Sequence, residues 1–304
     1  MHVGWPTSSN KQALATGDYD VTSVVHCNPY PAIDPSNFDF SGKAVLVTGA
    51  SRGLGRAMVL AFAAAGASKI AAGARGDTAS LKDVVASSAR ANGHVEPQFL
   101  PLALDVADEA SVGATAVAIR AEFGRLDVVV NNAGVLGSFG KVGDTDPGQW
   151  WRVFQVNLLG PYLVSRAMIP LLRQSEHSYV IHVASVGAHL VNPALSAYQT
   201  SKAALVRFSQ LLDREYSDDG VTSFSVHPGN CQTDIMGPGE LDDFHKSIYI
   251  DSPELCAQSL VYLTSEPRPW LGGRYVNCTW DLPELMAQKD AIVEGDKLKV
   301  KLDF

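Results

Sequence analysis

The fold is decided by residues 44–55, Ala44-Val45-Leu46-Val47-Thr48-Gly49-Ala50-Ser51-Arg52-Gly53-Leu54-Gly55. An apolar segment with strand character runs into a glycine-rich turn, and an alanine-rich helical segment follows it as far as Gly66. Gly49 would permit the tight bend, Gly53 would let the backbone approach a pyrophosphate at a helix N terminus, and Gly55 would let the helix pack closely. This order predicts a nucleotide-binding turn, although the G-x-x-x-G-x-G spacing is also compatible with glycines that merely form a loop.

Short apolar segments alternate with helix-length segments along the rest of the chain. Segments that are apolar on both faces and separated by helices indicate a parallel sheet covered on both sides. The sequence therefore predicts an α/β fold, a Rossmann-like, doubly wound parallel sheet with helices on both faces, in a single domain. The seven predicted strands are Ala44–Thr48, Ile70–Ala74, Gln98–Leu104, Asp127–Asn131, Tyr179–Ala184, Thr222–His227 and Tyr275–Asn277.

Cap residues mark three helix starts, at Asp108, Asp146 and Ser252, because each precedes a proline or an acid in the first turn. A further proline, Pro161, falls inside the helical stretch 147–172. We expect this helix to be kinked or locally unwound just after Asn157.

The two ends of the chain lack this alternation. Residues 1–40 show no sustained period and contain several prolines, so an extended N-terminal arm outside the core is expected there. On this view the arm could be deleted through about residue 35 without loss of folding. The predicted organisation is an arm over 1–40, a catalytic domain over 41–280 and a C-terminal extension over 281–304.

Composition restricts the partners. The chain has 304 residues, 46% of them hydrophobic, and a formal charge of −8, which disfavours nucleic acid and anionic membranes and favours a small-molecule partner. Its four cysteines are scattered, and no His cluster has metal-ligand spacing, so neither a metal site nor a disulfide framework is expected. No export signal or membrane-spanning stretch is evident, which favours a cytoplasmic location.

Tyr198 and Lys202 form the second motif with chemical content. At i and i+4 they share one face of a helix, where the lysine ammonium would favour the ionised phenol and lower its pKa. Ser185 precedes Tyr198 by thirteen residues. Taken alone, such a pair is more often a surface tyrosine and lysine of an amphipathic helix.

Together these motifs resemble the short-chain dehydrogenase/reductase family. The segments Tyr30–Pro35 and Gly273–Val276 are in addition similar to members from filamentous fungi. The resemblance covers about residues 40–280 and includes Asn131-Asn132-Ala133-Gly134, Asn157, and Pro228-Gly229 with Thr233 in the expected order. It implies that Tyr198 is the general acid/base and that Ser185 orients the carbonyl. It further implies that Lys202 tunes Tyr198 and binds the nicotinamide ribose, and that Asn157 holds a water of the proton relay.

The resemblance also implies the cofactor contacts. Members that prefer NAD place an acid at the end of the second strand, where this chain has Ala74 followed by Arg75. Arg52 and Arg75 could instead pair with the 2′-phosphate of NADP(H), although both could be ordinary surface charges. The residues expected to bind the cofactor are Gly49, Ser51, Arg52, Gly53, Leu54, Gly55, Arg75, Asp105, Val106, Asn132, Ala133, Gly134, Tyr198, Lys202, Pro228, Gly229 and Thr233.

The predicted function is NADP(H)-dependent reduction of a ketone or aldehyde, or the reverse oxidation. Two alternatives remain open, a non-redox enzyme such as an epimerase, dehydratase or cyclase, and a catalytically silent NADP-binding regulatory protein. His189 and Asn192 lie between Ser185 and Tyr198, where family members line the substrate pocket. The fungal resemblance suggests a ketone of secondary metabolism, and the family suggests a homodimer or homotetramer.

Overall fold

The computed structural model describes residues 21–233, 235 and 243–302. Its seven strands form one parallel sheet in the order β3-β2-β1-β4-β5-β6-β7. The order reverses between β1 and β4, so the carboxyl ends of these two strands flank the switch point at which such sheets bind ligands. The prediction of a Rossmann-like, doubly wound parallel sheet is confirmed.

The strands are close to those expected from the sequence. In five of the seven, one or both boundaries differ from the predicted ones by a single residue. Their bounds are β1 Ala44–Thr48, β2 Lys69–Ala74, β3 Gln98–Ala103, β4 Val128–Asn131, β5 Ser178–Val183, β6 Val221–His227 and β7 Tyr275–Asn277. The helices are α2 Gly53–Ala64, α3 Lys82–Ala91, α4 Glu109–Glu122, α5 Pro147–Phe154, α6 Gly160–Leu172, α7 Ser196–Tyr216, α8 Asp243–Ile248, α9 Pro253–Thr264, α10 Leu282–Ala287 and α11 Lys289–Glu294. No helix among the described residues is long and apolar enough to cross a membrane.

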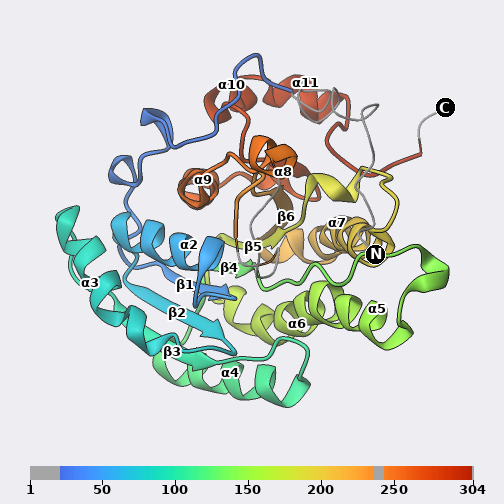
Figure 1. Cartoon of the computed structure of the whole chain (residues 1–304). Coiled ribbons are helices and arrows are strands. Elements are labelled where there is room, and N and C mark those ends of the chain that lie inside the picture. The colour runs from blue at the N-terminus through green and yellow to red at the C-terminus, as the bar shows by residue number, and fades with distance from the viewer. Residues whose placement is uncertain (1–20, 234, 236–242, 303–304) are drawn as a thin grey trace.

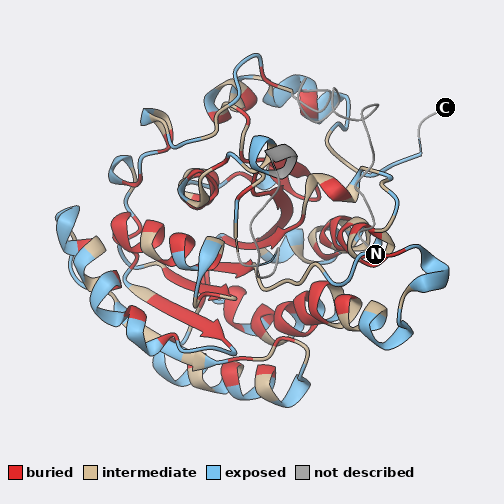
Figure 2. Cartoon of the chain, viewed as in Figure 1, coloured by how far each residue is buried: buried red, intermediate tan, exposed pale blue. Residues whose placement is uncertain are grey.

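Alternate residues of the central strands face two separate cores. Val45 and Val47 of β1 belong to a cluster with α2 and α9, whereas Leu46 belongs to a cluster with α4 and α6. Figure 1 shows these helix pairs on opposite sides of the sheet, and Figure 2 shows that all strands except the edge strand β3 are largely buried while the outer helix faces are exposed. Burial on both faces explains why the strands are continuous apolar runs.

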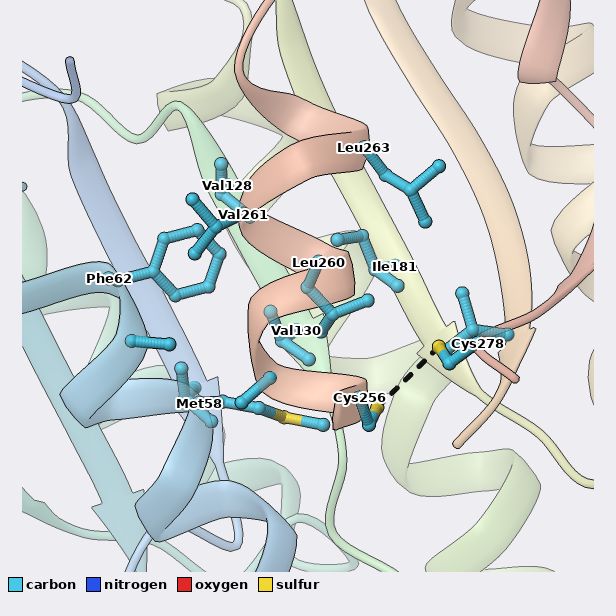
Figure 3. Packing of buried hydrophobic residues seen from close by; sticks show 14 of the residues in the cluster. Met58, Phe62, Val128, Val130, Ile181, Cys256, Leu260, Val261, Leu263 and Cys278 are labelled. Atoms are coloured by element: carbon cyan, nitrogen blue, oxygen red, sulfur yellow. Dashed lines mark hydrogen bonds between the residues drawn. The ribbon is translucent and has the colours of Figure 1, made fainter. Parts of the chain in front are cut away.

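Helix α9 is the main cover of one face. Leu260 and Val261 are fully buried in one cluster with Phe62 of α2 and with Val128 and Val130 of β4 (Figure 3). At its first turn, the Sγ atom of Cys256 lies 3.7 Å from that of Cys278, which follows β7. The two thiols therefore pack side by side in the core.

The three predicted helix caps are confirmed. Asp108, Asp146 and Ser252 each precede a helix, and their side chains accept hydrogen bonds from the backbone N–H groups of Ala110, Gln149 and Leu255. These bonds satisfy donors that a helix start leaves without an intrahelical partner.

The predicted break near Pro161 is also confirmed. A five-residue π-helix, η5 (Gln155–Leu159), separates α5 from α6 and contains Asn157. Pro161 has no N–H to donate to the Asn157 carbonyl four residues earlier, so a regular α-helical ladder cannot continue there.

Residues 21–40 differ from the expected extended arm. They form two short 3₁₀ turns, η1 (Pro31–Ile33) and η2 (Pro35–Asn37), and they bury the side chains of Ile33 and Phe40 in the cluster under α2 and α9. Prolines set the backbone angles of this segment, so its two core residues carry no helical or strand period. Residues 1–20 of the expected arm lie outside the described residues.

The same segment is bonded to the C-terminal residues. The His26 Nε2 atom lies 3.0 Å from an Asp281 carboxylate oxygen, and the Tyr30 hydroxyl accepts the N–H of Leu282 at 2.8 Å. The Ser23 N–H donates to the Glu284 carboxylate. Leu282 itself is fully buried, so the expected C-terminal extension also contributes to the core.

Phe40→Ala is expected to lower the free energy of unfolding by about 3–5 kcal/mol, because it empties a fully buried aromatic site. Urea unfolding followed by circular dichroism measures the change. Val24→Ala is the matched control, since that side chain is about half exposed and should alter stability by less than about 0.5 kcal/mol. Equal midpoints for the two variants would show that residues 21–40 contribute nothing to the core.

Candidate active site

The glycine turn after β1 has the geometry its sequence suggested. Gly49 has a φ of 67°, and a Cβ there would come within 2.9 Å of the Ala133 Cα. A Cβ on Gly55 would lie 2.3 Å from the Gly49 carbonyl oxygen. Gly49 has a left-handed backbone, and close backbone contacts leave no room for a Cβ at either position, so both favour glycine.

The turn is joined to the loop after β4. The Thr48 hydroxyl accepts the N–H groups of Asn132 at 3.0 Å and Ala133 at 3.1 Å, and the Asn132 amide donates to the Thr48 carbonyl at 2.8 Å. These bonds hold together the carboxyl ends of β1 and β4, which are neighbours at the switch point of the sheet. The Asn132 side chain therefore helps to fix the backbone conformation of the glycine turn.

A groove of about 570 Å³ opens over this turn. A volume of this size suits a small molecule or cofactor. The lining residues anticipated from the sequence are Gly49, Ser51, Arg52, Gly53, Leu54, Gly55, Arg75, Asp105, Val106, Asn132, Ala133, Gly134 and Thr233. Those not anticipated are Ala74, Gly76, Asp77, Leu104, Val135, Val156 and Ile235. Most of these unanticipated residues lie at or just after the carboxyl end of a strand. That position in the sequence could have indicated that they line the groove.

Four of the residues expected to bind the cofactor are not among the groove-lining residues, namely Tyr198, Lys202, Pro228 and Gly229. Gly229 has a φ of 88°, and a Cβ there would lie 2.9 Å from an Asp251 carboxylate oxygen. The same carboxylate accepts the Asn230 N–H at 2.6 Å. The Pro-Gly pair therefore shapes the loop that leads to Thr233, which does line the groove.

The end of β2 carries one cation and one acid. Ala74 occupies the position where an acid would hold a ribose diol, and Arg75 is exposed and makes no ion pair within the described part of the chain. Asp77, two residues later, also lines the groove. Hydrogen bonds from the N–H of Ala79 and from Ser80 lower the pKa of Asp77, so it is ionised at neutral pH. Sequence reasoning missed this negative charge.

Ser185 and Tyr198 meet at the carboxyl end of β5. Ser185 precedes the short turn η6 (Val186–Ala188), and its hydroxyl accepts the Gly187 N–H at 3.0 Å. Tyr198 lies in the first turn of α7 and is hydrogen-bonded to the Ser185 side chain. Burial raises the pKa of Tyr198, the Ser185 bond lowers it, and the nearby Tyr249 phenol raises it again.

Lys202 lies one turn after Tyr198 and is almost fully buried. Its Nζ atom donates to the Val183 carbonyl at 2.7 Å and lies 5.8 Å from the centre of the Tyr198 ring. Burial lowers the pKa of Lys202 to about 8. The sequence predicts a tyrosine pKa lowered by this lysine; that direction is wrong for the arrangement observed, because desolvation of the phenol dominates and the ammonium is held by Val183.

Asn157 connects the π-helix η5 to the loop after β4 and to helix α7. Its Oδ1 atom accepts the Val135 N–H at 2.9 Å, and its Nδ2 atom donates to the Val135 carbonyl at 2.9 Å and to the Ser201 hydroxyl at 3.1 Å. A Cβ on Gly134 would lie 3.4 Å from Asn157 Oδ1 and 3.6 Å from Lys202 Nζ. The structure thus brings Asn157 and Lys202 together beside Gly134.

Other residues considered from the sequence have varied surroundings. His182 lies within β5 and is fully buried, and desolvation and the charge of Lys202 lower its pKa to about 3, so it is a core residue. The His189 ring packs edge-on against Tyr275 at 4.6 Å, and the Asn192 N–H donates to the Gln199 side chain at 2.9 Å. Burial raises the pKa of the Cys231 thiol, which suits packing rather than nucleophilic attack.

No three His, Cys, Asp or Glu side chains within residues 21–233, 235 and 243–302 are grouped so that they could hold a metal ion. The sequence suggests a substrate flap over 232–251, and its Gly237-Pro238-Gly239 segment lies outside the described residues.

A Rossmann-like sheet with a glycine turn at its switch point, next to a Ser, Tyr and Lys set, defines the class of nucleotide-dependent oxidoreductases. The model of the short chain dehydrogenase family matches residues 43–242. The chain belongs to this family, whose members bind a nicotinamide cofactor and act on small molecules.

Relatives in filamentous fungi agree with this assignment. Short chain dehydrogenase pigC of Monascus ruber is 62% identical over 290 residues, which are 95% of this chain and 95% of the relative. Short chain dehydrogenase tazN of Aspergillus terreus is 52% identical over 280 residues, which are 91% of this chain and 60% of the relative. Among solved structures, a short-chain type dehydrogenase/reductase from Mycobacterium marinum is 29% identical, with a TM-score of 0.70 over 81% of this chain and 97% of that one.

Proposed function

We propose that the protein is an NADPH-dependent carbonyl reductase, or the corresponding alcohol dehydrogenase in the reverse direction. The observation that carries the proposal is the hydrogen-bonded Ser185–Tyr198 pair with Lys202 buried one turn away. Gly134, which lies beside Lys202, also lines the cofactor groove, so Lys202 adjoins that groove. The catalytic domain over 41–280, a cytoplasmic location and a homodimeric or homotetrameric state are part of the same proposal.

The residues present fit a dinucleotide. The groove has the required size, two of its glycines have no room for a Cβ, and the N terminus of α2 faces it with no acid in the first turn. Such a helix end favours a pyrophosphate through its free N–H groups and its dipole. When bound, a nicotinamide nucleotide supplies the hydride.

The side chains supply the proton and hold the oxygen. Ser185 donates a hydrogen bond to the substrate carbonyl oxygen, and Tyr198 transfers its phenolic proton to the same oxygen as negative charge develops there. The raised pKa of Tyr198 keeps the phenol protonated at neutral pH, as a proton donor must be. Lys202, with a pKa of about 8, is mostly protonated at pH 7 and supplies positive charge next to this pair.

Asn157 acts in the return of the proton. Its side chain is used by Val135 and Ser201, so the group left for a water is its carbonyl, which Pro161 cannot reach with a helical N–H. A water there would link Lys202 to solvent. This role is the reason we include Asn157 with Ser185, Tyr198 and Lys202 in the catalytic set.

Arg75→Asp is expected to reverse the cofactor preference, because it replaces the cation in the groove wall by an acid beside Asp77. The ratio of kcat/KM for NADPH to that for NADH should fall by about 100-fold, the equivalent of roughly 3 kcal/mol for a charged hydrogen bond lost and a repulsion gained. Arg120→Asp on the exposed face of α4 is the control and should leave the ratio unchanged. Equal use of the two nucleotides by the unmodified protein would contradict the NADP(H) assignment.

A panel of ketones and aldehydes tests the reaction class. Loss of NADPH absorbance should follow addition of a substrate, with NADH run in parallel. A product formed without net nucleotide oxidation would favour the epimerase, dehydratase or cyclase alternative. Nucleotide binding without any turnover would favour a silent regulatory protein, an alternative that the complete Ser, Tyr and Lys set makes the weaker one.

A further inference from the structure

Three exposed apolar side chains lie on loops at the carboxyl edge of the sheet. Phe139 follows β4, Val191 follows β5 and Ile250 follows β6, and these three strands are neighbours in the sheet. Val191 is 94% exposed, Ile250 57% and Phe139 40%. We call these three residues the apolar rim. Exposed side chains of this size in one region mark a binding surface more often than isolated ones do.

The loops of the apolar rim are held in place. The Gly140 N–H donates to the Ala194 carbonyl at 3.1 Å, which joins the loop of Phe139 to that of Val191. Ala194 has a φ of 69°, a strained conformation for a residue with a Cβ. Strain held by surrounding bonds is typical of functional sites. The exposure of Val191 is therefore a property of a fixed loop.

Two of the three loops that carry the apolar rim are connected to the catalytic residues through neighbours of Val191 and Ile250. Asn192, next to Val191, is bonded through its N–H to Gln199, the neighbour of Tyr198. Ile250 follows Tyr249, whose phenol lies close enough to raise the pKa of Tyr198. The neighbouring Asp251 is fixed by its bonds to Asn230.

Few charges accompany Phe139 and Val191, whereas Asp251 follows Ile250 in the third loop. The segments 135–143 and 186–195 contain no acid, and their only titratable residues are Lys141 and His189. Loss of solvent against Tyr275 lowers the pKa of His189, so it is neutral at pH 7. This surface would bind apolar groups better than multiply charged ones.

We propose that the substrate is a carbonyl compound with an extended apolar body, which lies across Phe139, Val191 and Ile250 while its carbonyl reaches Ser185 and Tyr198. This inference rests on the proposed reductase function. The occupant is the substrate's own apolar part, because the apolar rim is joined to the catalytic pair through two of its three loops.

A series of methyl ketones, from 2-butanone to 2-undecanone, tests the inference with NADPH as the reductant. The reacting group is the same throughout, so kcat/KM should rise about threefold per added methylene until the chain spans the apolar rim. A flat dependence on chain length would overturn the inference while leaving the reductase function intact.

Substitutions in the apolar rim test whether it causes the dependence of kcat/KM on chain length. Val191→Ser and Ile250→Ser should each lower the ratio of kcat/KM for 2-undecanone to that for 2-butanone by about tenfold, mainly through KM. Val117→Ser, at an exposed valine of α4, is the matched control and should leave that ratio unchanged. Dissociation of an oligomer by Val191→Asp, with the ratio unaltered in Val191→Ser, would instead assign the apolar rim to a contact between two copies of the chain.

Binding without turnover separates the two proposals. Primary alkyl amides of the same chain lengths are not reduced, and their dissociation constants can be measured by calorimetry in the presence of NADP⁺. Affinity that increases in similar steps per methylene supports the apolar rim even if no ketone of the panel is reduced. Affinity independent of length overturns it.

Discussion

Tyr198→Phe is expected to lower kcat by about 10²–10⁴-fold, because it removes the proton donor for the developing alkoxide. The phenol acts on the transition state, so KM and the affinity for NADPH should change little. Stopped-flow or steady-state NADPH absorbance measures turnover, and quenching of tryptophan fluorescence on titration with NADPH measures binding.

The matched control is Tyr216→Phe at the last position of the same helix. It removes a hydroxyl from α7 outside the site and should retain normal turnover. If Tyr198→Phe reduced a genuine substrate at a nearly normal rate, the proton donor would be another group, and the regulatory and non-redox alternatives would gain weight.

Lys202→Met should abolish most turnover and yet leave the protein as stable as before or more stable. Lowering the lysine pKa from 10.5 to about 8 means that burial of the charge costs the folded state roughly 3 kcal/mol at pH 7. Loss of the hydrogen bond to Val183 offsets part of the gain, by about 1–2 kcal/mol. Thermal unfolding of both proteins at pH 7 measures the difference.

The pH dependence supplies a second readout. The folded pKa of Lys202 lies below its unfolded value, so the cost is complete below about pH 8 and disappears as the pH approaches 10.5. The stability advantage of Lys202→Met over the unmodified protein should therefore shrink between these two values. Lys82→Met, at an exposed lysine of α3, should show neither the gain nor this trend. A marked loss of stability in Lys202→Met would mean that the lysine is structural.

The sequence predicted the sheet well because its determinants are local. Strands buried on both faces are continuous apolar runs, as in Ala44–Thr48, and a proline without an N–H must disturb a helix wherever it falls, as Pro161 does. The ordered motifs likewise identified Ser185, Tyr198 and Lys202, and the structure places Ser185 and Lys202 next to Tyr198.

What could not be predicted depends on distant partners. Ile33 and Phe40 lie in a segment without a period, and only the packing of α2 and α9 shows that they are core residues. The direction of the Tyr198 pKa depends on the balance between burial and neighbouring charges, which the i, i+4 spacing does not contain. Asp77 lines the groove because β2 ends there. In the sequence it is a single acid among polar loop residues, and nothing in that pattern indicates that it faces the groove.

The bonds between residues 21–30 and residues 281–288 also bear on how the chain is made. Asp281, Leu282 and Glu284 are synthesised 255, 252 and 261 residues after their partners His26, Tyr30 and Ser23. These three bonds can therefore form only after synthesis has passed Glu284. A nascent chain that stops before Asp281 cannot make them, so this part of the fold forms late during synthesis.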